Sequence, residues 1–136
     1  MNLIACVEDK MGMMFNHRRE SQDGVLRDEI VRLAKGKKLW MDEYSAKQFE
    51  DHPDDLSVDE WFMEKAGPGD YCFVEKADPA LFKDKIEKII LYRWNRRYPA
   101  DKYFDIPLDH WKLVSTRDFP GSSHEKITEE IYEPAE

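Results

Sequence analysis

Two stretches at opposite ends of the chain decide the fold. The first reads Met1-Asn-Leu-Ile-Ala-Cys-Val-Glu-Asp-Lys-Met-Gly-Met-Met-Phe15, and the second reads Ala100-Asp-Lys-Tyr-Phe-Asp-Ile-Pro-Leu-Asp-His-Trp-Lys-Leu-Val114. Within the first, Leu3–Val7 is a short continuous apolar run, which is typical of a strand buried on both faces of a sheet. The second leads into Trp111–Arg117, which predicts a late strand. We therefore expect a sheet that contains both ends of the chain.

Between these ends, the sequence predicts alternating helices and strands. Ser21–Gly36 has apolar residues at helical spacing and a closing glycine, which predicts a helix. Ser57 and Glu60 have the spacing of a capping box, which predicts the start of another helix. Alternation of this kind favours a mostly parallel sheet covered by helices on both faces. Further strands are expected at Lys37–Met41, Asp70–Glu75 and Ile86–Trp94, with a final antiparallel pair at Trp111–Arg117 and Ile127–Tyr132.

Composition limits the classes of function. The 136 residues suit one domain spanning 1–136, and 41% hydrophobic residues with 12% aromatics predict a folded chain. A net charge of −8 argues against binding to nucleic acid or to an anionic membrane. Cys6 and Cys72 have no neighbouring cysteine or histidine, and the four histidines are scattered, so we expect no metal site. We expect a cytoplasmic protein, because no signal peptide or apolar span is visible.

The order and spacing of these segments resemble the dihydrofolate reductase family. Leu3–Val7, followed by Gly12, is similar to the family's first strand and the start of its mobile substrate loop. Lys38–Met41 resembles its second strand. Three later segments are similar to its late strand, its Asp-Thr-x-Phe turn and its Trp-containing strand: Lys85–Tyr92, Asp101–Phe104 and Leu108–Ser115. The resemblance implies an α/β fold, a single-domain three-layer sandwich whose mostly parallel sheet ends in an antiparallel strand pair.

The chain departs from the family where the family binds NADPH. The family's second strand runs into a Gly-Arg-His/Lys-Thr element that holds cofactor phosphates, and here the matching residues are Asp42-Glu43-Tyr44-Ser45. The family's Gly-Gly strand end allows close approach of the pyrophosphate, whereas Cys72–Asp78 contains no glycine and two further acids. Carboxylates repel phosphate, so we expect no cofactor.

The substrate side of the resemblance is partly kept. Either Asp23 or Asp28 matches the carboxylate that binds the pterin in the family, although an acid early in a helix is also favoured by the helix dipole alone. Tyr92 stands where the family has a supporting Thr. The basic run His17-Arg18-Arg19 replaces an apolar lid, and it is also typical of mixed surface charge. The candidate ligand-binding residues are Met13, Phe15, His17, Arg18, Arg19, Asp23 and Tyr92, and no catalytic residue is assigned beyond the candidates Asp23 and Asp28.

Three functions follow from this sequence. The favoured hypothesis is a diverged protein that has lost NADPH-dependent reduction and binds a small molecule or a protein partner through the old cleft. The alternative is an active pterin or folate reductase with an altered use of NADPH. A second alternative is nucleic-acid binding through residues 92–98, where aromatic and arginine residues interleave. Strand alternation weakens that alternative, because Tyr92 and Trp94 share one face and Arg93 takes the other.

Overall fold

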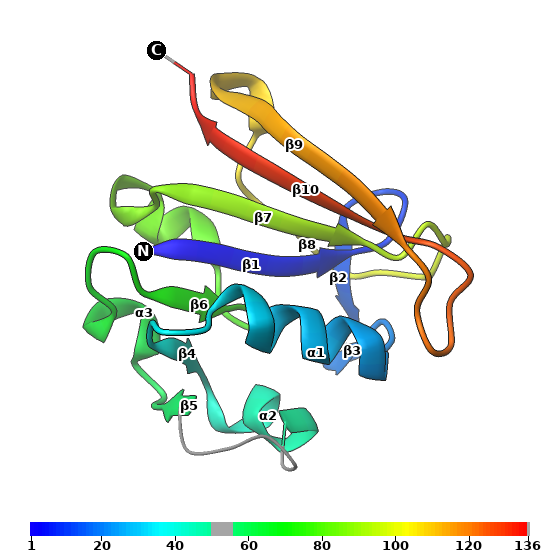
Figure 1. Cartoon of the computed structure of the whole chain (residues 1–136), viewed down its shortest axis with the longest axis horizontal. Coiled ribbons are helices and arrows are strands. Elements are labelled where there is room, and N and C mark those ends of the chain that lie inside the picture. The colour runs from blue at the N-terminus through cyan, green and yellow to red at the C-terminus, as the bar shows by residue number, and fades with distance from the viewer. Residues whose placement is uncertain (50–55, 136) are drawn as a thin grey trace.

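A seven-stranded sheet forms the centre of the molecule in the computed structural model, which describes residues 1–49 and 56–135 (Figure 1). Its order is β5-β4-β6-β1-β7-β10-β9. The first five strands in this order run parallel, and β10 is antiparallel to both β7 and β9. The strands are β1 (Asn2–Val7), β4 (Leu39–Met41), β5 (Leu56–Val58), β6 (Tyr71–Phe73), β7 (Lys88–Arg93), β9 (Trp111–Phe119) and β10 (Ile127–Pro134). The predicted mostly parallel sheet with a final antiparallel pair is confirmed.

The sheet buries a separate apolar cluster on each face, which makes the fold a three-layer sandwich. On one face, Ile4 and Ile90 pack with Leu26 and Ile30 of α1 (Gly24–Leu33), the helix in front of the sheet in Figure 1. Each such aliphatic side chain contributes about 1.5–3 kcal/mol on burial. The other face is covered by shorter elements: α3 (Phe62–Lys65), η2 (Pro79–Lys85) and η3 (Leu108–His110).

The helix α1 is shorter than the predicted Ser21–Gly36, because Asp23 caps it. The Asp23 carboxylate accepts hydrogen bonds from the backbone N–H groups of Val25 (2.9 Å) and Leu26 (3.3 Å), which fixes the first turn. With ten residues, α1 exceeds α2 (Glu43–Ala46) and α3 in length. Within residues 1–49 and 56–135, no helix has the length and apolar character needed to cross a membrane.

The predicted capping box at Ser57 and Glu60 is wrong. Ser57 lies in β5, where it pairs with Trp40 of β4, so its backbone is held by the sheet. The nearby helix α3 starts after Trp61, which provides no side-chain cap. Asp59 supplies the local side-chain acceptor instead, since its carboxylate accepts a 2.8 Å hydrogen bond from the Trp61 N–H. Pairing along the sheet therefore overrides the local capping pattern.

A small three-stranded sheet follows β1, where the resemblance implied a mobile loop. It contains β2 (Gly12–Phe15), β3 (Arg18–Arg19) and β8 (Lys102–Tyr103), in the order β3-β2-β8. The turn between β2 and β3 is Asn16-His17, and both residues have positive φ (51° and 64°), as a two-residue type I′ hairpin requires. The Asn16 N–H also donates to the Asp101 carboxylate (3.0 Å), so the hairpin tip is fastened to the chain before β8.

Candidate functional site

The carboxylate of Asp23 is enclosed by the loop that joins β9 and β10. Oδ1 accepts from the Ser122 N–H (2.9 Å) and hydroxyl (3.1 Å), in addition to the α1 cap. Oδ2 accepts from the Ser123 N–H (2.8 Å) and hydroxyl (3.1 Å), and lies 3.0 Å from His124 Nδ1. The Asp23 side chain is 0% exposed. We call Asp23, Ser122, Ser123 and His124, together with Ser21, the Asp23 cluster.

The hydrogen bonds of the Asp23 cluster keep its carboxylate ionised. Burial alone would raise the pKa of Asp23. The hydrogen bonds from His124 and from the backbone of Ser122, Ser123 and Leu26 outweigh burial and hold the pKa well below its usual range. Because both oxygens already accept several bonds, the carboxylate can orient its neighbours but presents no oxygen to an open substrate site.

His124 is held from three sides in this cluster. Its ring stacks on Trp94, with centroids 4.5 Å apart and 28° between the planes. Nε2 lies 3.1 Å from the Ser21 hydroxyl and 3.4 Å from the Tyr98 hydroxyl, while Nδ1 faces Asp23. The imidazole is therefore fixed in one orientation between a carboxylate and two hydroxyls.

A second buried cluster lies between α2 and the end of β6, centred on Glu75. Arg19 binds the Glu75 carboxylate with two nitrogens, Nε at 2.9 Å and Nη2 at 3.1 Å. Ser45 Oγ (2.8 Å) and Gln48 Nε2 (3.3 Å) donate to the same carboxylate. The guanidinium also lies over the Tyr44 ring, 4.4 Å from its centroid. This Glu75 cluster fills the space beside the first turn of α2.

Two narrow cavities remain between the Asp23 and Glu75 clusters. Each has a volume of about 10 Å³, and both are lined by Cys6, Ser21, Glu75 and Trp94. A cavity of this size holds about one water molecule. The space between the two clusters is therefore too small for a planar heterocycle in this structure.

The residues at the expected cofactor positions do not fit NADPH. The resemblance places phosphate groups at the start of α2 and at the end of β6. At the start of α2, the Ser45 N–H donates to the Asp42 carboxylate (2.8 Å) and the Ser45 hydroxyl donates to Glu75. At the end of β6, the Glu75 carboxylate would itself face a phosphate. The donors are already used and the added charges are negative, so both positions disfavour a phosphate.

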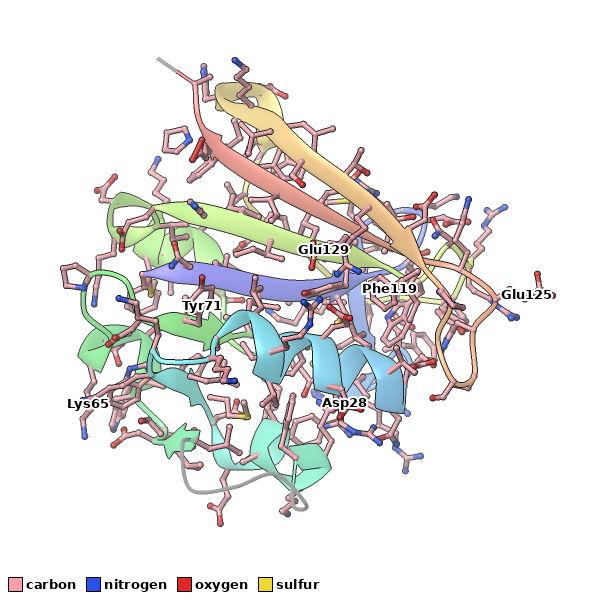
Figure 2. All side chains as sticks on the ribbon, viewed as in Figure 1. Asp28, Lys65, Tyr71, Phe119, Glu125 and Glu129 are labelled. Carbon is pink, nitrogen blue, oxygen red and sulfur yellow. The ribbon has the colours of Figure 1, made fainter. Side chains whose placement is uncertain are left out.

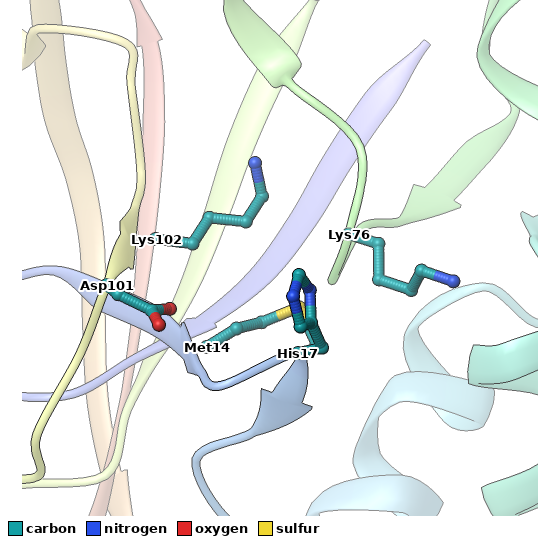
Figure 3. A pocket seen from close by; sticks show the side chains of 5 residues that line it. All are labelled: Met14, His17, Lys76, Asp101 and Lys102. Carbon is teal, nitrogen blue, oxygen red and sulfur yellow. The ribbon is translucent and has the colours of Figure 1, made fainter.

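A larger surface pocket lies beside the turn of the β2–β3 hairpin, where Met14 and His17 line it. Its volume is about 410 Å³, within the range of small-molecule sites. Figure 3 shows the imidazole of His17 beside Met14, with Lys76 on one side and Lys102 and Asp101 on the other. We call these five residues the anion pocket.

Two ammonium groups and an imidazole give the anion pocket its chemistry. Lys102 Nζ lies 2.5 Å from the exposed carboxylate of Asp78, and Lys76 Nζ lies 5.2 Å from the centroid of the Tyr44 ring. A cation–π contact uses the ring face and fills no hydrogen bond of the ammonium. Asp101 has one carboxylate oxygen engaged by the Asn16 N–H (3.0 Å). The arrangement suits a small ligand that carries negative charge.

The structure separates the predicted ligand-binding residues. His17 lines the anion pocket, whereas Arg19 and Asp23 belong to the two buried clusters. Tyr92 is fully buried and donates to the Glu129 carboxylate (2.8 Å). The remaining candidates have different surroundings: Met13 is buried, Phe15 and Arg18 are exposed, and Asp28 is exposed on α1 (Figure 2).

Several site residues escaped the sequence analysis. Ser21 and His124 join Asp23 although His124 is 101 positions away from it, in the loop between β9 and β10. In the anion pocket, Lys76 and Lys102 come from different parts of the chain. Two features of the sequence could have indicated the Asp23 cluster: the hydroxyl-rich run Ser122-Ser123-His124, and an acid, Asp23, at the start of a helix.

Two of the three aromatic residues in the arginine-rich segment are buried, and the third, Tyr98, is half-buried and packs against the same apolar cluster. Tyr92 and Trp94 are both buried in the cluster beneath α1, as the strand alternation predicts. Arg93 on the other face lies 2.5 Å from Glu130. Base stacking needs exposed rings, so this segment lacks the surface expected of a nucleic-acid site. Within residues 1–49 and 56–135, no group of three or more His, Cys, Asp or Glu side chains could hold a metal ion.

The sheet order, the antiparallel final pair and the single long helix on one face define a dihydrofolate reductase-like fold. Among solved structures, the dihydrofolate reductase of Enterococcus faecalis, complexed with NADP(H) and RAB-propyl, is similar with a TM-score of 0.69. The match covers 99% of this chain and 96% of that chain at 7% sequence identity. No family model and no curated protein matches the sequence. The likeness therefore concerns the fold.

Proposed function

We propose that this protein does not catalyse NADPH-dependent reduction and that it binds a small anionic ligand in the anion pocket. The observation that carries the proposal is the ion pair between Arg19 and Glu75, with side chains 19% and 9% exposed, beside the first turn of α2. It occupies a position that the resemblance gives to cofactor phosphate. A small molecule is favoured over a protein partner, because the pocket of about 410 Å³ is concave.

Charge in the pocket supports an anion over a neutral ligand. Lys76 and Lys102 lie on opposite sides of the pocket, and His17 adds an imidazole that can donate a hydrogen bond. Asp101 is the one acid among the five lining residues, and its carboxylate already accepts from the hairpin. An anion between the two ammonium groups would replace the weak surface pairing of Lys102 with Asp78.

A thermal-shift experiment tests the loss of the cofactor. NADPH at 1 mM, with and without dihydrofolate, is expected to leave the melting temperature unchanged, because a ligand that binds the folded state must stabilise it. NADPH oxidation followed by absorbance is expected to stay at the rate of the buffer alone. A rise in melting temperature or a protein-dependent loss of NADPH would contradict this part of the proposal.

Titration calorimetry with phosphate, pyrophosphate and citrate tests the anion pocket. We expect at least one of these probes to bind, with an affinity reduced about tenfold by Lys76→Ala, as for loss of one charge-assisted hydrogen bond of roughly 1.5 kcal/mol. The matched control is Lys35→Ala, an exposed lysine outside the pocket, which should bind as the parent does. Equal affinities of all three proteins, or no heat from any probe, would overturn the pocket assignment.

One observation favours the reductase alternative. Asp23 stands at the start of the first helix, where the family keeps its pterin-binding carboxylate, and Asp28 lies on the exposed side of that helix. Pterin binding would require the loop with Ser122 and Ser123 to leave the carboxylate. The NADPH oxidation measurement separates the two functions, since a working reductase consumes NADPH when dihydrofolate is added.

A further inference from the structure

Three side chains of the Asp23 cluster form a continuous hydrogen-bonded relay. The Ser21 hydroxyl lies 3.1 Å from His124 Nε2, and His124 Nδ1 lies 3.0 Å from Asp23 Oδ2. The imidazole thus lies between a hydroxyl and a carboxylate, each on a different ring nitrogen. A nucleophile within hydrogen-bond reach of a base, which a third group orients, is the arrangement that activates serine in acyl-transfer enzymes.

The carboxylate decides which ring nitrogen of His124 carries the proton. Hydrogen bonds hold the pKa of Asp23 well below its usual range despite burial, so the carboxylate is ionised and accepts a hydrogen bond from Nδ1–H (3.0 Å). Nε2 of the neutral ring is then an acceptor. The Ser21 hydroxyl donates to it, and the Tyr98 hydroxyl lies 3.4 Å from the same nitrogen.

The ring is also prevented from turning away. It stacks on Trp94 and is 4% exposed, while Ser123 Oγ lies 3.3 Å from Nδ1 on the same side as the carboxylate. Asp23 is fixed in turn by the cap of α1 and by the Ser122 and Ser123 backbone. Preorganisation of this kind is what a catalytic relay requires.

We propose that Ser21 is a nucleophile activated by His124 as general base, with Asp23 as the positioning residue, and that it accepts acyl groups from small carboxylic esters. Ser21 is half-buried, and it lines both narrow cavities of about 10 Å³. Each cavity holds about one water molecule and excludes the ester itself, so a substrate must reach the partly exposed Ser21 from solvent and be small. Gln22 and Arg27 line one of these cavities, and their N–H groups are donors of the type that stabilise an oxyanion.

The reaction balances without a further reactant except water. Ser21 Oγ forms a bond to the ester carbonyl carbon while its proton moves to His124 Nε2. The bond from that carbon to the leaving oxygen then breaks, and the leaving alcohol takes the proton from Nε2. Water repeats the same steps on the acyl-serine, which releases the carboxylic acid and restores the Ser21 hydroxyl.

Covalent labelling with a fluorophosphonate tests the nucleophile on the full chain. The serine oxygen bonds to phosphorus, fluoride leaves, and the proton passes to His124, so an activated serine gains one phosphonyl group. We expect mass spectrometry to place the label on Ser21 and p-nitrophenyl acetate to release nitrophenolate in the presence of the protein. Ser21→Ala should abolish both signals, and His124→Gln should slow both about 100-fold, as general-base catalysis contributes at least that factor.

Matched variants separate activation from folding. Ser115→Ala removes an exposed hydroxyl of β9, and Lys35→Ala removes an exposed ammonium that follows α1, and neither residue belongs to the Asp23 cluster. Both should be labelled at Ser21 at least half as fast as the parent, with melting temperatures recorded for every variant. The proposal is overturned if the parent is labelled no faster than Ser21→Ala, if the label lies on another residue, or if Ser115→Ala loses labelling while it stays folded. Labelling that survives in a folded His124→Gln protein would also overturn it.

Discussion

The Asp23 cluster and the anion pocket differ in how their polar side chains are surrounded: those of the cluster are bonded to other protein groups, and those of the pocket face solvent. In the Asp23 cluster, a carboxylate that is 0% exposed accepts from the backbone of α1, from two serines and from His124. In the anion pocket, Lys76 and Lys102 line an open volume of about 410 Å³. The first region is closed and its hydrogen bonds are internal, whereas the second depends on solvent or a ligand.

This difference shows where the fold can change its function. A buried polar group is tolerated when all of its hydrogen bonds are made, so a closed cluster becomes part of the stability of the fold. Charged side chains at a surface pocket can be replaced with little change in the free energy of unfolding, because solvent hydrates and screens them. Asp23, the fully enclosed residue of the first region, should therefore respond to substitution through folding, and the pocket should respond through ligand affinity.

The largest effect is expected from Asp23→Ala. It removes the α1 cap and leaves the N–H groups of Ser122 and Ser123 and one ring nitrogen of His124 without their acceptor. We expect a loss of about 3–5 kcal/mol in the free energy of unfolding, measured by urea denaturation at pH 7. Lys35→Ala, at an exposed position that follows the same helix, is the control and should cost less than about 1 kcal/mol. If both variants lost the same free energy of unfolding, the proposed difference between the closed Asp23 cluster and exposed positions would be wrong.

The same carboxylate gives the closed region a pH dependence. The pKa of Asp23 in the folded protein lies below its value of about 3.9 in an unfolded chain. Its contribution to stability is therefore complete above about pH 4 and is lost as the pH falls through the folded-state pKa. Unfolding curves between pH 7 and pH 2.5 should show this loss in the parent protein, and it should be smaller in Asp23→Asn.

A second, smaller effect is expected in the Glu75 cluster. Arg19→Ala leaves the Glu75 carboxylate, 9% exposed on its side chain, with Ser45 and Gln48 as neutral donors. We expect a cost of about 2 kcal/mol, below that of Asp23→Ala, because the Arg19 side chain is itself 19% exposed. A double-mutant cycle with Glu75→Ala should give a coupling energy of about 1–2 kcal/mol. A coupling near zero would show that the pair contributes no mutual stabilisation.

Local sequence patterns were sufficient to predict most of the fold. The apolar run Leu3–Val7 and the β-branched stretch Ile86–Trp94 correspond to β1 and β7, the two central strands. The helical spacing of Leu26 and Ile30 placed α1 against the sheet. A helix or strand that is buried on one or both faces has a characteristic pattern of apolar residues in the sequence, so it can be predicted without tertiary information. The Ser57 prediction failed where strand pairing and local capping compete.

The candidate site was much less accessible to sequence analysis. Asp23 was named as a ligand-binding residue, yet the groups that occupy its oxygens lie about 100 positions later in the chain. The sequence places Arg19 in a basic run and Glu75 among acids that repel phosphate, but it gives no sign that the two side chains bind each other. Hydrogen bonds of this kind produce no periodic pattern in the sequence, because each one depends on a single residue far away along the chain.

The smallest expected effect on stability concerns Glu20, which precedes Ser21 of the Asp23 cluster and is influenced by the charge of Asp101 in the anion pocket. Burial, together with the charges of Glu8 and of Asp101 in the anion pocket, raises the pKa of Glu20 to about 7. No hydrogen-bond partner of the buried Glu20 Oε1 is found among residues 1–49 and 56–135. An acid with a raised folded-state pKa binds its proton more tightly when folded, so the protein should lose stability as the pH rises from about 4.3 to 7.

Glu20→Gln removes this titration and should stabilise the protein. Since part of the side chain reaches solvent, we expect a gain of about 1 kcal/mol at pH 8 and a smaller gain at pH 5, measured by urea unfolding at both values. The control is Glu43→Gln at an exposed position of α2, which should change stability by less than about 0.5 kcal/mol. A loss of stability at pH 8 would mean that the Glu20 carboxylate makes a favourable ionic contact, and that the closed region extends through Glu20 to the edge of the anion pocket.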